Sequence, residues 1–494
     1  MRKIGFDNEK YLAMQSERIC ERVERFGGRL YLEFGGKLFD DHHASRVLPG
    51  FQPDSKIRML LQLREQVEIV VAVSAEDIEK NKVRGDLGIP YTNDTFRLID
   101  VFRNFGLYVG SVVLTRYAGQ PAAEIFRRQL ESQGLPVYRH YTIDGYPYDI
   151  ARIVSEDGYG RNEFVEATHP VVVVTAPGPG SGKMAVCLSQ LYHEHRRGVR
   201  AGYAKYETFP VWNLPLRHPV NLAYEAATAD LNDMNMIDPY HLEAYQVPAV
   251  NYNRDVEIFP VLKTMFEGIL STSPYLSPTD MGVNMAGNCI IDDNIVCEAA
   301  KDEVLRRYYQ ELYRQRRGIS DGREVYRIEL LMKELHLTAL SRRVVAPALE
   351  VAARTGAPAA AIELPNGTIL TGKTSDLLGA ASALLLNAVK HLAGIGDPVY
   401  LIGPEVIGPV QELKVNVLGN KNPLLHIDEL LVALSICAVT DPNAKLARDQ
   451  LQKLRGSEVH STVILSEADE DSFRRLGVHL TCEAKYESQK LYHG

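Results

Sequence analysis

The chain has 494 residues, enough for two to four domains, and its 45% hydrophobic and 24% charged residues are typical of a globular protein. Its net charge of -8 argues against a general nucleic-acid binder or a membrane-surface binder. No apolar run approaches the roughly 18 residues of a membrane span, and the start has no apolar signal core, so we expect a cytoplasmic protein. The six cysteines form no C-x-x-C pair, so we expect neither a disulfide framework nor a zinc knuckle.

Residues 1–165 are predicted to form a Rossmann-like α/β domain. Runs of β-branched residues predict strands, amphipathic runs predict helices, and the two alternate along the chain. Such alternation is typical of a doubly wound, mostly parallel sheet. The G-x-G-x-x-G fingerprint of dinucleotide binding is absent from this segment. The predicted strands are 29–34, 67–73, 108–115 and 137–142, and the predicted helices are 8–25, 54–66, 94–105 and 120–133.

Polar residues gather just after the first predicted strand, where open α/β sheets bind their ligands. Asp41 and His43 are candidate metal ligands or catalytic groups. Gly36, Lys37 and Arg46 are candidate phosphate-binding residues. A solvated loop that caps a helix is the alternative. If the strand continued, neighbouring side chains would point in opposite directions, so we expect an open substrate or weak metal site and no closed structural metal.

The segment from Val171 to Met184 predicts a strand, a glycine-rich loop and a helix, in the order of a phosphate loop. Two positions depart from the full pattern, because Pro177 stands where glycine is usual and Met184 offers no hydroxyl to Mg²⁺. A glycine-rich turn without a ligand is the alternative. The predicted phosphate-binding residues are Gly178, Gly180, Ser181, Gly182 and Lys183.

A predicted strand over 201–207 follows, with Lys205 near its end. This order of strand, loop, helix and lysine-tipped strand is similar to dethiobiotin-synthetase-type phosphate-loop enzymes, and the resemblance implies that Lys205 also binds phosphate. We expect a phosphate-loop-like domain over 166–294, with an irregular polar segment over 212–260. Asp292 is a candidate catalytic acid that positions Mg²⁺, and a helix N-cap is the alternative.

Residues 295–356 are predicted to form a helical connector, and 357–494 a C-terminal α/β domain with strands over 399–402 and 459–465. Within that domain, 367–374 fits G-x-x-x-x-G-K-[ST] at every position. A strand, a turn and a second strand are nevertheless predicted over 360–371. Because a hairpin uses its amides for pairing, we expect a β-hairpin here and no nucleotide loop.

Several runs resemble one uncharacterised bacterial family over essentially the whole chain. They are Glu33–Asp41, Arg46–Phe51, Ala176–Lys183, Thr371–Asp376 and Arg455–Leu465. The chain is similar to the domain-of-unknown-function family numbered eighteen-forty-six. The resemblance implies a cytosolic bacterial protein with no assigned reaction, and therefore no catalytic residues to transfer.

Two functions are consistent with these patterns. The first is an enzyme that binds a nucleotide, such as ATP with Mg²⁺, or another phosphorylated metabolite and catalyses phosphoryl transfer or ATP-dependent chemistry. The second is a non-catalytic metabolite sensor or an assembly scaffold, which the missing hydroxyl at Met184 favours. In both cases we expect a small phosphorylated ligand, no membrane and a homo-oligomer.

Overall fold

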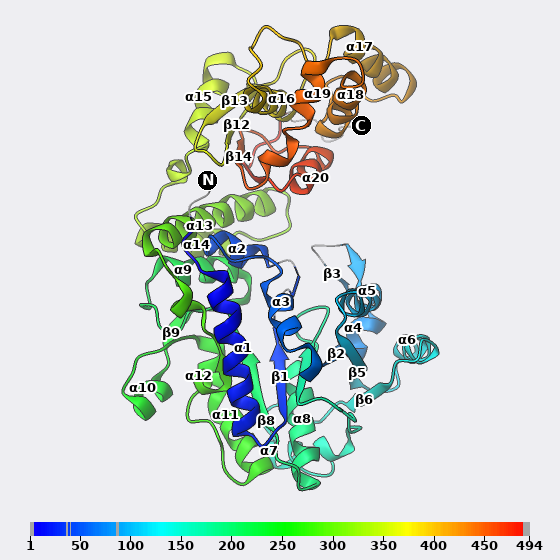
Figure 1. The fold of residues 1–494 in the computed structure, drawn as a ribbon, viewed down its shortest axis with the longest axis vertical. Helices are drawn as coiled ribbons and strands as arrows, with labels where there is room; N and C mark the ends of the chain where they lie inside the picture. Colours follow the sequence, from blue (N-terminus) through cyan, green and yellow to red (C-terminus); the bar gives the residue numbers. More distant parts are fainter. Residues whose placement is uncertain (1–3, 36–37, 40, 85–87, 488–494) are drawn as a thin grey trace. The chain divides into compact units, whose positions relative to one another are not determined.

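The computed structural model describes residues 4–35, 38–39, 41–84 and 88–487. It divides into two compact units, Ile4–Ala300 and Lys301–Gly494. Each unit has its own sheet and its own helices (Figure 1). Among the described helices, none is long and apolar enough to cross a membrane.

The first unit is built on a seven-stranded sheet in which every pairing is parallel. Its strand order is β11-β8-β1-β7-β2-β5-β6. The central strands are buried along their whole length, which explains their continuous apolar sequences. The prediction of a mostly parallel α/β fold is confirmed. The strands are β1 (Leu30–Phe34), β2 (Val67–Ser74), β5 (Tyr108–Tyr117), β6 (Val137–Tyr141), β7 (Val171–Thr175), β8 (Gly202–Tyr206) and β11 (Gly282–Val283).

Helices cover both faces of this sheet (Figure 1). From α1 (Asn8–Arg25), the Tyr11 hydroxyl lies 2.7 Å from that of Tyr206 on one face. On the other face, the Tyr31 hydroxyl donates to Glu194 of α8 (Lys183–Arg196) over 2.8 Å. Strands from both predicted segments, 1–165 and 166–294, belong to this one sheet.

Residues 212–260 are more regular than the sequence suggested, and the prediction of an irregular segment is wrong. They contain α9 (Pro219–Ala227), α10 (Pro239–Tyr245), the start of α11 (Asn253–Leu270) and the antiparallel pair β9 (Asn235–Ile237) and β10 (Val250–Tyr252). The remaining elements of this unit are α2 (His42–Val47), α3 (Ser55–Gln62), α4 (Ala75–Glu79), α5 (Tyr91–Asn104), α6 (Pro121–Ser132), α7 (Ile150–Ile153), α12 (Pro278–Met281), β3 (Val83–Arg84) and β4 (Ile89–Pro90).

The second unit contains a mixed sheet in the order β13-β12-β14-β15. β12 (Ala359–Glu363) pairs antiparallel with β13 (Ile369–Lys373), which confirms the predicted hairpin. The predicted strand over 399–402 is wrong, because Leu401 and Ile402 are buried in the core without strand pairing. The other elements are α13 (Asp293–Arg316), which enters from the first unit, α14 (Arg323–Glu334), α15 (Val345–Thr355), α16 (Ala380–Ala393), α17 (Pro404–Glu412), α18 (Ile427–Cys437), α19 (Pro442–Arg448), α20 (Glu467–Arg475), β14 (Glu458–Ser461) and β15 (His479–Cys482).

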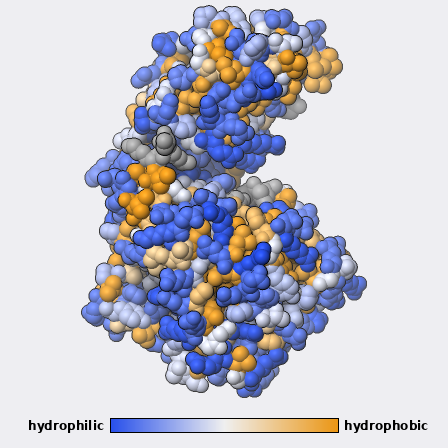
Figure 2. Space-filling view, viewed as in Figure 1, coloured by the Kyte–Doolittle hydropathy of each residue, from blue (hydrophilic) through white to orange (hydrophobic). Residues whose placement is uncertain are grey.

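An apolar surface remains exposed on this second unit (Figure 2). On α18 and just after it, Val432 and Ile436 are each 62% exposed and Val439 is 81% exposed. No charged side chain occurs between Leu430 and Thr440. Exposed apolar patches of this kind are typical of protein contact surfaces.

The starts of α18 and α20 are joined by one carboxylate. Asp469 accepts a hydrogen bond from the Ile427 amide over 2.7 Å, and its second oxygen lies 3.1 Å from His426 Nδ1. The Ser466 hydroxyl also donates to this carboxylate over 2.8 Å. The hydrogen bond to Asp469 raises the pKa of His426 above its usual value, although burial opposes the shift.

This pair predicts a pH-dependent contribution to stability. The folded pKa of His426 is raised above its unfolded value of about 6.5. Its contribution is therefore complete below about pH 6.5 and is lost as the pH rises through the folded pKa. We expect His426→Gln to remove this dependence in thermal melts between pH 5 and 9. The exposed His391→Gln is the control, and an unchanged pH profile in the His426 variant would contradict the assignment.

Candidate functional site

The glycine-rich loop and the start of α8 lie at the carboxyl end of β7, in the middle of the sheet. Gly182 immediately precedes the helix with φ of +81°, and no side chain caps the first turn. The Thr115 hydroxyl donates to the Ser181 carbonyl over 2.7 Å, and the Ser181 hydroxyl donates to the Gly178 carbonyl over 2.9 Å. These two hydrogen bonds fix the loop, and among the described residues no side chain caps the first amides of α8.

Close packing requires glycine at the beginning of this loop. A Cβ atom on Gly178 would lie 2.1 Å from the Tyr91 hydroxyl oxygen. The tip at Pro179 and Gly180 is exposed, whereas Ser181 is buried. The structure thus brings four of the residues predicted to bind phosphate into one compact turn, and the fifth, Lys183, is the first residue of the helix.

Glu33 borders this loop and was missed in the sequence analysis. Its Cα pairs with Val174 on β7, one residue before the strand ends. Glu33 is only 9% exposed, and the Tyr203 hydroxyl donates to its Oε2 over 2.7 Å. The one signal in the sequence was an acid at the second-last position of an otherwise apolar strand.

Cys187, near the start of α8, is sensitive to the charges of both Glu33 and Lys183. Burial raises the pKa of Cys187 well above its usual value. The negative charge of Glu33 raises it further, whereas the positive charge of Lys183 opposes the shift. A basic group and an acidic group therefore both act on the start of this helix.

Lys205 also lies near the carboxyl end of its strand, β8, which is two strands away from β7. Its ammonium group is already bound by acidic side chains. Its Nζ lies 2.8 Å from Glu207 and also forms an ion pair with Asp255 and a hydrogen bond with the Tyr252 hydroxyl. Burial opposes its charge, yet the two carboxylates raise the pKa of Lys205 well above its usual value. We assign Lys205 to this network and not to phosphate.

The residues after β1 have structural partners. Asp41 accepts a hydrogen bond from the Ala44 amide over 3.1 Å at the start of α2 and forms a 2.8 Å ion pair with Lys56. Although burial opposes its charge, Lys56 holds the pKa of Asp41 below its usual value. The His43 ring packs edge-on against Phe209, with 5.2 Å between centroids.

The other predicted site residues do not gather at the loop in the described part of the chain. Arg46 lies in α2, and Gly36 and Lys37 lie outside the described residues. Asp292 accepts a hydrogen bond from the Ile295 amide over 3.2 Å just before α13, as expected for the N-cap alternative. It follows β11, which is the edge strand on the side of the sheet opposite to β6.

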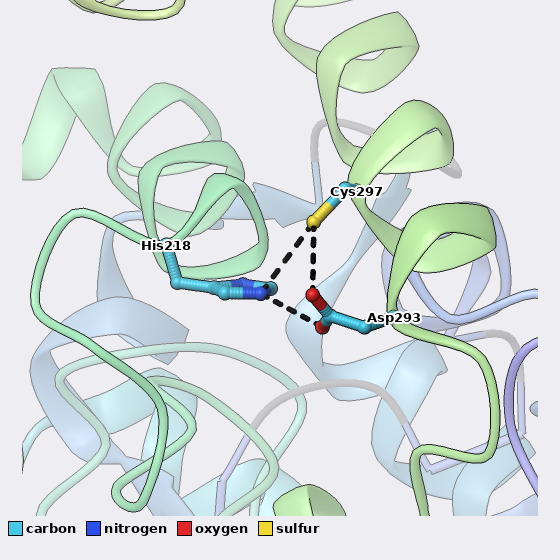
Figure 3. Close-up of side chains that lie close together, drawn as sticks. All are labelled: His218, Asp293 and Cys297. Carbon is cyan, nitrogen blue, oxygen red and sulfur yellow. Dashed lines mark hydrogen bonds and ion pairs between the residues drawn. The ribbon is translucent and has the colours of Figure 1, made fainter.

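One group of potential metal ligands occurs among the described residues, formed by His218, Asp293 and Cys297 (Figure 3). His218 Nε2 lies 3.0 Å from Asp293 Oδ1 and 3.5 Å from Cys297 Sγ, and Sγ lies 3.7 Å from Asp293 Oδ2. Ligands about 2.0–2.3 Å from a tetrahedral Zn²⁺ lie roughly 3.3–3.6 Å from one another. The distances alone are therefore close to those of a zinc site.

The position of the imidazole proton argues against a metal. The Val220 amide donates to His218 Nδ1 over 3.2 Å, so Nδ1 is the acceptor nitrogen of the neutral ring. Nε2 must then carry the proton, and it has no lone pair for a metal or for the Cys297 thiol proton. A metal-bound histidine instead donates through its second nitrogen. We interpret this group as a hydrogen-bonded contact between α9 and α13.

This interpretation predicts that the protein does not bind zinc at this group. Purified protein should contain no stoichiometric zinc, and added zinc should not raise the melting temperature. The measurement is metal analysis by mass spectrometry together with thermal melts of the wild type and of Cys297→Ser. Zinc retained at one equivalent by the wild type and lost from the variant would contradict the assigned proton position.

The Lys205 network predicts a large loss of stability on removal of its cation. Lys205→Met should cost about 3–5 kcal/mol, because two buried carboxylates lose their partner. Adding Glu207→Gln and Asp255→Asn to this variant should restore part of the loss. Urea unfolding is followed by the fluorescence of Trp212, the chain's single tryptophan, whose ring lies beside Gly282 in the same unit. A loss below about 1 kcal/mol, as for exposed ion pairs, would contradict this account.

Comparison with known proteins shows a full-length match to one family. The family described as Domain of unknown function DUF1846, N-terminal, matches residues 4–336, and the corresponding C-terminal family matches residues 340–492. UPF0371 proteins of Streptococcus pyogenes serotype M5 (strain Manfredo) and Streptococcus sanguinis (strain SK36) are each 55% identical over 492 residues, with 100% of both chains covered. A UPF0371 protein of Streptococcus uberis is 54% identical over the same length. The chain therefore belongs to the DUF1846 family of uncharacterised proteins.

Proposed function

We propose that the protein binds a phosphorylated small molecule, such as a nucleotide or a sugar phosphate, at the start of α8. The observation that carries this proposal is the uncapped first turn of α8 behind Gly182. Amides at a helix N-terminus point toward a bound anion, and the helix dipole favours negative charge there. Lys183 adds a full positive charge at the same place.

The topology of the sheet supports this location. From β1 the chain continues to β2 on one side, whereas from β7 it continues to β8 on the other. The loops after these neighbouring strands therefore leave in opposite directions. Open α/β sheets bind their ligands in the crevice at such a switch point.

The same residues favour phosphate binding over the usual Mg²⁺-nucleotide hydrolysis of phosphate-loop enzymes. Met184 cannot supply the hydroxyl that those enzymes place on Mg²⁺. The second lysine of the dethiobiotin-synthetase-type pattern, Lys205, is engaged by Glu207 and Asp255. Phosphoryl transfer is therefore the secondary candidate, and binding of a phosphorylated ligand is our conclusion.

The proposal predicts that Lys183→Ala abolishes stabilisation by phosphorylated ligands. A ligand at 100 times its Kd raises the free energy of unfolding by about 2.7 kcal/mol. The measurement is a thermal-shift screen with inorganic phosphate, nucleotides and sugar phosphates on both proteins. Lys263→Ala, an exposed lysine of α11, is the matched control. Equal stabilisation of the wild type and the Lys183 variant, or no stabilisation by any of these compounds, would refute the proposal.

A further inference from the structure

Glu33 is a buried carboxylate without a cationic partner. In the described part of the chain, no lysine, arginine or histidine nitrogen lies within 4.0 Å of its oxygens. Its hydrogen-bond donor is the neutral hydroxyl of Tyr203. Buried charges in proteins are normally paired or bind metal ions.

Neighbouring carboxylates at this end of the sheet show the usual pairing. Asp41 is paired with Lys56, and Glu207 and Asp255 share Lys205. Lys205 is the strand neighbour of Glu33 in the β1–β8 register, yet its Nζ is turned to the other two acids. Glu33 is one of the charges that raise the pKa of Lys205, yet the two side chains form no ion pair within 4.0 Å. Among the described residues Glu33 therefore has no direct cationic contact, which leaves room for a cation that binds from outside.

The position of Glu33 connects this feature to the phosphate-binding loop. Adjacent strands lie about 4.8 Å apart, so the Glu33 backbone is one strand spacing from the end of β7. The charges of Glu33 and Lys183 both act on the Cys187 thiol inside the first turns of α8. An anion bound at the start of α8 would repel the carboxylate on this neighbouring strand, and a cation between them would relieve the repulsion.

We propose that Glu33 binds a divalent cation of the Mg²⁺ type together with the phosphate group at α8. Mg²⁺ prefers oxygen ligands and is typically held by one or two carboxylates, substrate phosphates and several waters. Glu33 supplies the protein ligand, in place of the hydroxyl that Met184 lacks. This inference depends on the proposed phosphate site, which the experiment tests separately.

The experiment measures the effect of Mg²⁺ on the affinity for inorganic phosphate, by thermal shift and calorimetry. In the wild type, Mg²⁺ should tighten phosphate binding by about 5-fold to 150-fold, the usual range of coupling between two sites. Glu33→Gln should reduce this effect below about 2-fold and should leave phosphate binding without Mg²⁺ equal or stronger. Glutamine can still accept the Tyr203 hydrogen bond, so the variant should keep its melting temperature.

The matched control is Glu68→Gln. Glu68 is a buried carboxylate near the amino end of β2, whereas the proposed site lies at the carboxyl end of the strands. This variant should retain the coupling. Phosphate binding that ignores Mg²⁺ in the wild type, or coupling that survives in Glu33→Gln, overturns the inference and leaves the proposed function standing. Absence of phosphate binding under all conditions overturns both.

One further arm identifies the source of the cation. Ethanolamine phosphate is compared with ethyl phosphate, which has the same phosphate but no amine. Tighter binding of ethanolamine phosphate that depends on Glu33, without an effect of Mg²⁺, would show that the ligand carries its own cation and would overturn the metal assignment. Equal binding of the two compounds, with Mg²⁺ coupling present, supports the divalent cation.

Discussion

The parallel arrangement of the seven strands is the constraint on which the rest of the first unit depends. Because every pairing is parallel, the carboxyl ends of all seven strands lie at the same end of the sheet. Residues that are far apart in sequence therefore meet there. Glu33, Lys183 and Lys205 come from segments that are separated by up to about 170 residues, yet their strands and helix are neighbours. The chemistry of this end of the sheet is therefore set by the strand order.

Charge pairing distinguishes the parts of this end of the sheet that hold the fold together from the part available for a ligand. Lys205 and Asp41 each have a partner of opposite charge at 2.8 Å, and only 14% of each side chain is exposed, so we regard them as structural. The first amides of α8 and the carboxylate of Glu33 have no such charged partner in the described residues. A phosphate and a cation would complete both at once, since each group attracts the opposite charge.

Local sequence patterns predicted the elements that depend on local chemistry. Four valines predicted β7, glycine and the following helical pattern predicted α8, and the turn at 365–367 predicted the hairpin β12–β13. The helices over 212–260 were missed although Pro219 and Pro239 each follow a capping residue, His218 and Asp238. Proline at the first helical position after an N-cap is a helix-start signal, and polar composition obscured it.

The sequence could not predict the features that depend on tertiary contacts between distant parts of the chain. The partner of Lys205 in α11, Asp255, lies 50 residues further along the chain, so an occupied lysine and a free one look alike in sequence. Val399–Ile402 has strand-like composition, but Leu401 and Ile402 are buried in the core without a neighbouring strand to pair with. The position of Glu33 beside the end of β7 follows from the pairing of β1 with β7, which the local sequence does not reveal.

The most direct test of the phosphate site is a crystal structure of the protein with tungstate, an anion whose anomalous scattering locates it without ambiguity. Our account predicts an anomalous peak within hydrogen-bond distance of the backbone amides at Lys183 and Met184, with the Lys183 ammonium beside it. A well-occupied peak elsewhere on the molecule, with the start of α8 empty at the same tungstate concentration, would contradict the account.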